Sequence, residues 1–328
     1  MTEARKPRIR RIELTPLHVP FRAEVRQMMG SSTGGLGMAL KAEEPWLGGD
    51  FVICKLVADD GSEGLGEAFV WLPETGATPE QLVETVAKGL ARYVLGESPF
   101  DVQRLRRRLD DNVARSEIAK GLVDIACYDL MGTMTGRPAH DFMGGRCAES
   151  LPTAGLVPLV SVEMMVAMAQ HFQTAGHRTL RLKLGAGIEE DREIVAKVRE
   201  AVGPSMRLRV DYNQVYTPEQ AIRAIAAIAP FGIDCAEQPV RSNDILGMVR
   251  VQKAVTVPLM AHEACFTLRE IVEQVELGAV GVIGINAERP GGVTDALAAI
   301  DYAARRGLGV VMHNQPLGIG SAMQVHVG

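Results

Sequence analysis

The sequence has no long apolar run and no excess of positive charge, and each absence excludes a class of protein. No stretch approaches the roughly 18 consecutive apolar residues that a membrane-spanning helix requires. The basic start of the chain is followed by alternating residues rather than by the apolar core of a secretion signal. A net charge of −5 provides no basic surface for a nucleic acid. We therefore predict a cytoplasmic protein that binds neither membranes nor nucleic acids.

Cysteine is also scarce. The five cysteines are widely scattered and lack the short spacings of zinc sites or disulfide frameworks. We expect them to be reduced and mostly buried. The remaining composition, 47% hydrophobic and 23% charged, is ordinary for a globular protein and excludes a wholly disordered chain.

The character of the sequence changes near residue 148. Before this point, strand-like alternation with a predicted hairpin over residues 51–67 is followed by helical patterns between residues 78 and 135. Residues 28–38 contain six small or hydroxyl-bearing residues in a row and predict a mobile loop. After residue 148, short β-branched runs alternate with alanine-rich amphipathic segments, a pattern typical of βα units around a parallel sheet.

Seven strands are predicted in one unbroken βα series, at residues 151–157, 179–184, 207–211, 233–237, 258–263, 280–286 and 308–313. Such a series favours a barrel over an open sheet, and no glycine-rich dinucleotide turn follows the first strand. We therefore predict an α/β fold in which a (β/α)7β-type TIM barrel over residues 149–328 follows an α+β capping domain over residues 1–148.

Polar residues end six of these strands, where barrel enzymes carry their function. Neighbouring members of the set are 23 to 28 residues apart, about one βα unit, so all six should surround one mouth of the barrel: Lys183, Asp211, Glu237, Glu263, Asn286 and His313. Two further side chains, Arg181 and Asn213, should share this face because residues two apart on a strand point the same way.

Three of the six are carboxylates. Asp211, Glu237 and Glu263 would repel one another in a single cleft, and oxygen ligands suit a hard cation such as Mg²⁺. We therefore predict a Mg²⁺ site. The alternative is that each acid caps a neighbouring helix or pairs with an arginine.

Several motifs, taken in their order along the chain, resemble those of a known family. They are the hairpin residues Gly61, Gly64, Gly66 and Glu67, the segment Leu122-Val-Asp-Ile-Ala-Cys-Tyr-Asp-Leu130 with Gly136, Pro138 and Gly144-Gly145, and the barrel motifs Arg181-Leu-Lys183, Asp211-Tyr-Asn213, Glu237-Gln-Pro239 and Gly291-Gly292. Together they resemble the mandelate racemase and muconate lactonizing enzyme families of the enolase superfamily, over nearly the whole chain.

The resemblance implies a shared first step, in which a base removes the proton α to a carboxylate. Lys183 would be one base, and Mg²⁺ on the three acids would stabilise the resulting enediolate. Arg181 and Asn213 would contact the small carboxylate substrate. Homo-oligomers are expected, since relatives commonly form symmetric assemblies.

His313, in His313-Asn-Gln-Pro-Leu-Gly318, resembles the seventh-strand histidine of the mandelate racemase and acid-sugar dehydratase group. The aspartate paired with it in that group is replaced here by Asn286, which fixes a ring tautomer but cannot support an imidazolium charge. We therefore expect both residues to be catalytic and His313 to titrate at a lower pH. His262 stands where the muconate type usually has aspartate, so we expect Glu263 to be the third metal ligand and His262 to be the alternative.

The family's eighth strand, its electrophilic glutamate and its return segment are not found before Gly328, so we expect the barrel domain to lack its last strand. Within proton abstraction, the His-x-x-Pro-Leu-Gly run favours dehydration of a hydroxy or sugar acid. The alternative is a racemase or epimerase that uses Lys183 and His313 as two bases; the apolar, hydroxyl-bearing loop at 28–38 argues for it and against a polyhydroxy acid. The sequence is also compatible with a non-catalytic barrel that keeps a ligand site, and with a phosphate-binding barrel that uses Gly318-Ile-Gly320.

Overall fold

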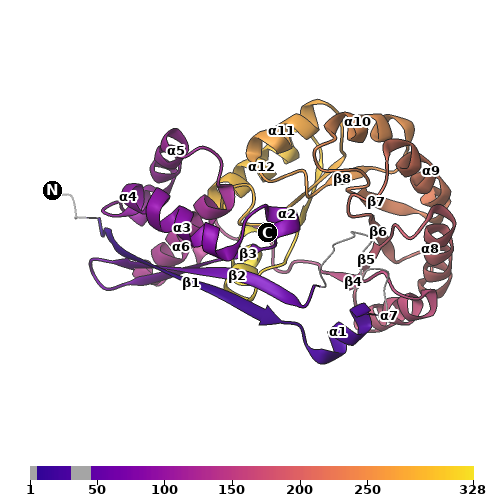
Figure 1. Ribbon diagram of the computed structural model, residues 1–328, viewed down its shortest axis with the longest axis horizontal. Coiled ribbons are helices and arrows are strands. Elements are labelled where there is room, and N and C mark those ends of the chain that lie inside the picture. The colour runs from indigo at the N-terminus through magenta and orange to yellow at the C-terminus, as the bar shows by residue number, and fades with distance from the viewer. Residues whose placement is uncertain (1–5, 31–45) are drawn as a thin grey trace.

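The computed structural model describes residues 6–30 and 46–328. The N-terminal part is an antiparallel sheet in the order β1-β2-β3 with helices packed on one face (Figure 1). Its elements are β1 (Ile9–Pro20), α1 (Ala23–Gly30), β2 (Gly48–Ala58), β3 (Glu63–Val70), α2 (Leu72–Thr75), α3 (Pro79–Glu84), the π-helical turn η1 (Thr85–Leu90), α4 (Ala91–Val94), α5 (Val102–Asn112) and α6 (Glu117–Thr135). Of the predicted loop at 28–38, residues 28–30 end helix α1 and residues 31–38 lie outside the described residues.

Two glycines of the predicted hairpin let α6 lie directly on β3. A Cβ atom at Gly64 would collide with Ala126 and Leu130, and one at Gly66 would collide with the carbonyl of Leu122. Asp129 of α6 then accepts a hydrogen bond from the Leu65 backbone N–H at 2.7 Å. The glycine motif is therefore a packing requirement of the capping domain.

The second part is a seven-stranded parallel sheet in sequence order, from β4 to β10. Figure 1 shows helices α7 to α12 as an outer arc around these strands. The strands are β4 (Ala154–Val157), β5 (Thr179–Lys183), β6 (Arg207–Asp211), β7 (Ile233–Glu237), β8 (Leu259–Ala261), β9 (Val282–Ile285) and β10 (Gly309–Met312). The helices are α7 (Val162–Thr174), α8 (Ile188–Val202), α9 (Pro218–Ile228), α10 (Ile245–Ala254), α11 (Leu268–Glu276), α12 (Val293–Arg305) and α13 (Gly318–Val327). The predicted fold class, a barrel-type α/β domain behind an α+β capping domain, is confirmed.

Strand ends differ in detail from the prediction. Lys183, Asp211 and Glu237 are the last residues of their strands. The later strands β8, β9 and β10 are shorter than predicted, and β8 pairs with β7 only at Leu259 and Met260. The predicted residues on those strands, Glu263, Asn286 and His313, therefore follow the strands instead of ending them. The boundary between residues 148 and 149 remains a prediction.

All five cysteines are free thiols, as expected. Only Cys147 is exposed, and burial raises the pKa of Cys54 and Cys235 to about 12. None of the helices in the described part of the chain is long and apolar enough to cross a bilayer.

Glu67 connects the capping domain to the barrel domain. Its carboxylate is buried and accepts backbone hydrogen bonds from Leu317, Ile319 and Gly320 at the start of α13, the last two at 3.0 Å. A helix start leaves its first N–H groups without partners and favours a negative charge. The carboxylate of Glu67 supplies both the hydrogen-bond acceptors and the negative charge.

We expect Glu67→Gln to lower the free energy of unfolding by about 1–3 kcal/mol, because an amide has one acceptor oxygen and its NH₂ group would face a backbone N–H. Urea unfolding measures the change. The matched control is Glu63→Gln on the same strand, whose half-exposed side chain pairs with Lys55 and should cost under about 0.5 kcal/mol. Equal effects of the two variants would contradict this role.

Asp124 of α6 occupies the start of α12. The buried carboxylate accepts hydrogen bonds from the Thr294 backbone N–H at 3.0 Å and from the Thr294 hydroxyl at 2.7 Å. Burial raises the pKa of Asp124 to about 7, against the lowering effect of both Thr294 contacts. The folded protein therefore holds a proton here that the unfolded chain has already lost between about pH 4 and pH 7.

We expect Asp124 to make the protein less stable as the pH rises through this window. In Asp124→Asn the amide oxygen accepts from the Thr294 backbone N–H and the NH₂ group donates to the Thr294 hydroxyl, which can act as an acceptor. The variant carries no charge, so it should raise the free energy of unfolding at pH 8 and flatten its pH dependence. The gain should be about 2–3 kcal/mol. This is smaller than the whole pKa shift would give at 1.36 kcal/mol per unit, because the N-terminus of α12 favours a carboxylate. Urea unfolding between pH 4 and pH 8 measures it. The exposed Asp111→Asn is the control, and parallel curves for both variants would contradict the assignment.

Candidate active site

Two carboxylates and two cations lie side by side where β5, β6 and β7 end. Arg181 donates from Nε to Glu237 Oε2 at 3.0 Å, and its Nη2 contacts Glu237 Oε1 and Asp211 Oδ2 at 2.5 Å each. Burial lowers the pKa of Arg181, but Glu237 and Asp211 outweigh this effect and raise it above its ordinary value. Arg181 contacts these two acids. Its role in substrate binding remains a prediction.

Lys183 lies on the other side of Asp211. Its buried ammonium donates to Asp211 Oδ2 at 2.6 Å and to Asn213 Oδ1 at 2.7 Å. Asn213 in turn donates to Glu263 Oε1 at 3.2 Å. A continuous chain of contacts therefore joins Lys183 to the third predicted carboxylate and brings most of the predicted residues into one cluster.

His262 stands among the acids. Its Nδ1 lies 3.3 Å from Glu237 Oε1, 3.6 Å from Glu263 Oε2 and 4.0 Å from Glu74 Oε1. Burial lowers the pKa of His262, but the neighbouring carboxylates of Glu237 and Glu263 reverse this effect and raise it to about 9. The pKa of Glu237 falls well below its ordinary value, because Arg181 and both histidines outweigh the cost of burial.

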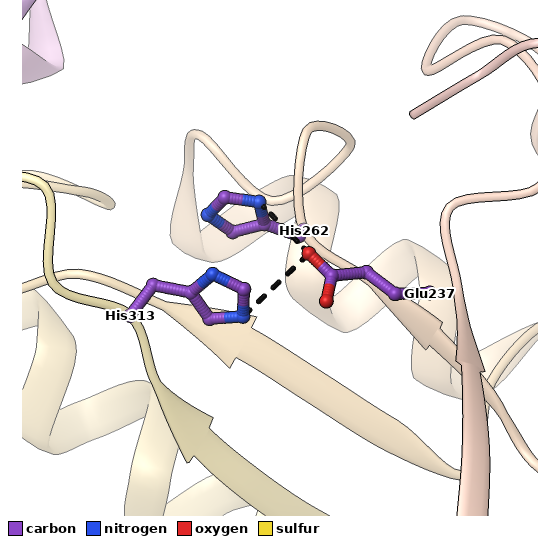
Figure 2. Close-up of side chains that lie close together, drawn as sticks. All are labelled: Glu237, His262 and His313. Atoms are coloured by element: carbon purple, nitrogen blue, oxygen red, sulfur yellow. Dashed lines mark ion pairs between the residues drawn. The ribbon is translucent and has the colours of Figure 1, made fainter. Parts of the chain in front are cut away.

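His313 approaches the cluster from the opposite edge of the sheet. Figure 2 shows Glu237 facing both histidine rings. The buried Nε2 of His313 lies 3.7 Å from Glu237 Oε1 and has no hydrogen-bond partner, and its ring stacks on His262 with centroids 3.7 Å apart. Burial and the adjacent positive charge of His262 lower the pKa of His313 well below its ordinary value. The predicted lowering of the His313 pKa is correct, but its main causes are burial and His262, not Asn286.

Asn286 differs from the prediction. Its Oδ1 lies 3.3 Å from His262 Nε2, and its Nδ2 donates to Glu288 and to Gln315. The expectation that Asn286 fixes the tautomer of His313 is wrong in this geometry, because the Asn286 amide oxygen faces His262 Nε2 instead. Its role in catalysis remains a prediction.

Sequence reasoning missed a buried polar group above His262. Glu74, from helix α2 of the capping domain, accepts hydrogen bonds from Arg289 Nη1 at 3.0 Å and from Gln315 Nε2 at 3.1 Å. Arg289 also donates to Gln315 and lies over the Phe266 ring, 4.2 Å from its centroid. No motif marks Glu74, because its partners lie more than 200 residues away in the chain.

Gln238 was also missed as a site residue, although it stands inside the Glu237-Gln-Pro239 motif. Its backbone has a φ of 33°, which is unfavourable for any residue except glycine. Its buried Oε1 accepts hydrogen bonds from the backbone N–H groups of His262 at 3.1 Å and Ala264 at 3.2 Å. Gln238 therefore holds the turn that carries His262 and Glu263.

The donor atoms in this cluster fit a divalent cation. Glu263 Oε2 is buried and has no hydrogen-bond partner, so it is an acceptor with unused capacity. Within the described ranges, Glu237, His262 and His313 are the one group of three or more potential ligand residues whose donor atoms all lie within 4.8 Å of one another. A cation bound here would share Glu237 with the guanidinium of Arg181.

Comparisons with known proteins agree with this architecture. Residues 47–144 match the mandelate racemase / muconate lactonizing enzyme N-terminal domain, and residues 164–328 match the enolase C-terminal domain-like family. The chain belongs to the mandelate racemase and muconate lactonizing enzyme family of the enolase superfamily. The resemblance predicted from the sequence motifs is confirmed.

Several members of this family are similar to the chain. A hydrophobic dipeptide epimerase of Enterococcus faecalis is 34% identical over 248 residues, which are 76% of this chain and 70% of that protein. An N-succinyl-L-Arg/Lys racemase of Bacillus cereus is 28% identical over 258 residues, 78% of this chain and 70% of that protein. A crystal structure of an E. faecalis dipeptide epimerase with Mg and the dipeptide L-Leu-L-Tyr gives a TM-score of 0.86 at 29% identity and covers 98% of this chain and 87% of its own.

These relatives narrow the range of reactions predicted for this chain. The protein is an enzyme of the enolase superfamily, as predicted, which disfavours the non-catalytic barrel. Its relatives are isomerases, so they support the predicted alternative, a racemase or epimerase, better than the dehydratase. The E. faecalis dipeptide epimerase structure contains Mg and a dipeptide, which is a small carboxylate.

Proposed function

We propose that the protein is a racemase or epimerase that removes the α-proton of a carboxylate substrate and returns a proton to the opposite face. The observation that carries the proposal is the placement of two proton-transfer groups at the two sides of Glu237. Lys183 lies on β5 and His313 follows β10, with four strands between them in the sheet. A substrate held over Glu237 would therefore have one group on each side.

His313 is suited to accept a proton, because its Nε2 is buried, unpartnered and uncharged in this environment. Lys183 is held by Asp211 and Asn213, and these contacts fix the position from which its Nζ can exchange a proton. Proton transfer by a positioned side chain contributes typically about 10²- to 10⁴-fold to a rate. Two such groups on opposite faces of one carbon satisfy the requirement for racemisation.

Asp211, Glu237 and Glu263 are the predicted Mg²⁺ ligands, and they lie within one chain of contacts that includes Arg181 and Asn213. A divalent cation, when bound, would neutralise the negative charge that develops on the substrate carboxylate. Arg181 holds Asp211 and Glu237 close together, while Asn213 positions Glu263. The seclusion of these groups from solvent strengthens each of these interactions.

For the substrate we propose an α-amino acid whose nitrogen is acylated or part of a peptide bond, the class named for both similar enzymes. Incubation of such acids with the protein and Mg²⁺ in heavy water, followed by NMR and chiral chromatography, tests the proposal. We expect deuterium at Cα and inversion of configuration without a keto acid. Formation of a 2-keto acid from a hydroxy or sugar acid, with no exchange in any N-acyl amino acid, would contradict it and favour the dehydratase.

A further inference from the structure

The imidazole of His262 occupies a position that a metal ligand requires. Of its two ring nitrogens, Nδ1 faces Glu237 at 3.3 Å and Glu263 at 3.6 Å, and Figure 2 shows its ring beside the Glu237 carboxylate. Glu263 Oε2, on the same side, has no hydrogen-bond partner. Two carboxylates and one imidazole nitrogen therefore converge here, whereas the sequence favoured Glu263 as the third ligand and left His262 as the alternative.

The other ring nitrogen, Nε2, faces two polar side chains. His262 Nε2 lies 3.3 Å from Asn286 Oδ1 and 3.4 Å from Arg289 Nη1. Asn286 Oδ1 can accept a hydrogen bond from Nε2–H, whereas the Arg289 guanidinium can only donate. With Nε2–H bonded to Asn286, a cation at Nδ1 would take the place of the proton that Nδ1 otherwise presents to Glu237 and Glu263. Metal-binding histidines are usually oriented by such an acceptor at the second nitrogen. Asn286 is itself fixed by its contacts with Glu288 and Gln315.

Asp211, by contrast, is already engaged. Its Oδ2 accepts from both Arg181 and Lys183, and its Oδ1 accepts from the Asn213 backbone N–H at 3.0 Å. Glu263 Oε2 has no hydrogen-bond partner and lies on the side of the cluster that His262 faces. A cation that used this oxygen would therefore lie within reach of the imidazole.

We propose that His262 Nδ1 is a ligand of the divalent cation, beside the predicted carboxylates, and that this nitrogen shifts the preference of the protein from Mg²⁺ toward Mn²⁺, Co²⁺ or Zn²⁺. Mg²⁺ binds oxygen ligands almost exclusively, whereas imidazole suits these transition metals. The inference rests on the proposed function, which requires a cation at this site. His313 keeps its role in proton transfer, because its ring nitrogens have no such orienting acceptor among the described contacts.

Two variants separate the histidines. His262→Asp restores the carboxylate that the muconate type usually has at this position, and His313→Asn removes the second imidazole while leaving His262 in place. Pulsed EPR of bound Mn²⁺ reports directly whether a nitrogen is coordinated. We expect nitrogen coupling in the wild-type protein and in His313→Asn, and its loss in His262→Asp. Coupling that survives in His262→Asp, or that disappears only in His313→Asn, would overturn the assignment.

Titration calorimetry with Zn²⁺ and Mg²⁺, each added alone, supplies the second measurement. Most sites bind Zn²⁺ more tightly than Mg²⁺, so the change between variants is decisive. We expect the ratio of the two affinities to fall at least about tenfold in His262→Asp, and to change much less in His313→Asn. An unchanged ratio in His262→Asp would overturn the inference.

Failure of this inference is distinguishable from failure of the proposed function. If Mg²⁺ supports α-proton exchange equally in the wild-type protein and in His262→Asp, and neither shows nitrogen coupling, the inference is wrong and the proposed function stands. If no divalent ion binds and no α-proton exchanges, both are wrong.

Discussion

Lys183→Met should abolish racemisation, with a loss of at least about 10²- to 10⁴-fold in turnover. Methionine has a similar length and no exchangeable proton, so one face of the substrate α-carbon would lose its proton-transfer group. Chiral chromatography of the product measures the rate. Because Lys183 also donates to Asp211, the Met variant alone would not separate proton transfer from a disturbed acid cluster.

Lys183→Arg is the matched control. Arginine keeps a permanent cation beside Asp211 but cannot give up its proton at any pH the protein tolerates. We expect Lys183→Arg to be as inactive as Lys183→Met while it binds the divalent cation within a few-fold of the wild-type protein. An arginine variant that retains more than about a tenth of the wild-type turnover would remove Lys183 from its assigned role.

Glu74→Leu should cost about 3–5 kcal/mol in the free energy of unfolding, because it leaves a buried charge without its partner. Arg289 is 1% exposed, and Glu74 is its carboxylate partner at 3.0 Å. Burial raises the pKa of Glu74, but Arg289 and His262 outweigh it and hold the pKa below its ordinary value. The ion pair joins the capping domain to the barrel directly above the candidate site. Urea unfolding at pH 7 measures the loss.

The double variant Glu74→Leu, Arg289→Met is the control for this prediction. With both charges removed, no buried ion remains unpaired, and apolar replacements of similar volume are often tolerated. We expect the double variant to recover at least about 2 kcal/mol relative to Glu74→Leu. If the loss in the double variant equalled the sum of the losses in Glu74→Leu and Arg289→Met alone, the two residues would not act as a pair.

The barrel and its functional mouth were predictable from the sequence because both depend on local repetition. Strands β5, β6 and β7 end at the predicted polar residues, since a short run of alternating apolar residues followed by a polar residue marks the point where a buried strand reaches solvent or a site. The capping box at Thr217 and Gln220 formed as its spacing predicts. Regular βα spacing then placed distant residues at one edge.

The contacts within the site were not predictable in the same way. That Asn286 faces His262 instead of His313 depends on where β8 and β9 stop, and strand boundaries carry a weak sequence signal. Glu74 reaches the site only because the capping domain packs on the barrel, a long-range arrangement with no local pattern. No local pattern showed that the fork-shaped guanidinium of Arg181 bridges two acids on neighbouring strands.

The most direct test of the account is the stereochemistry of α-proton exchange in two single variants. Each enantiomer of an N-acyl amino acid that the wild-type protein racemises would be incubated in heavy water with Lys183→Arg and with His313→Asn, in the presence of a divalent cation. We predict that each variant exchanges the α-proton of one enantiomer only, and that the two variants act on opposite enantiomers. Loss of exchange from the same enantiomer in both variants would contradict the placement of Lys183 and His313 on opposite faces of the α-carbon.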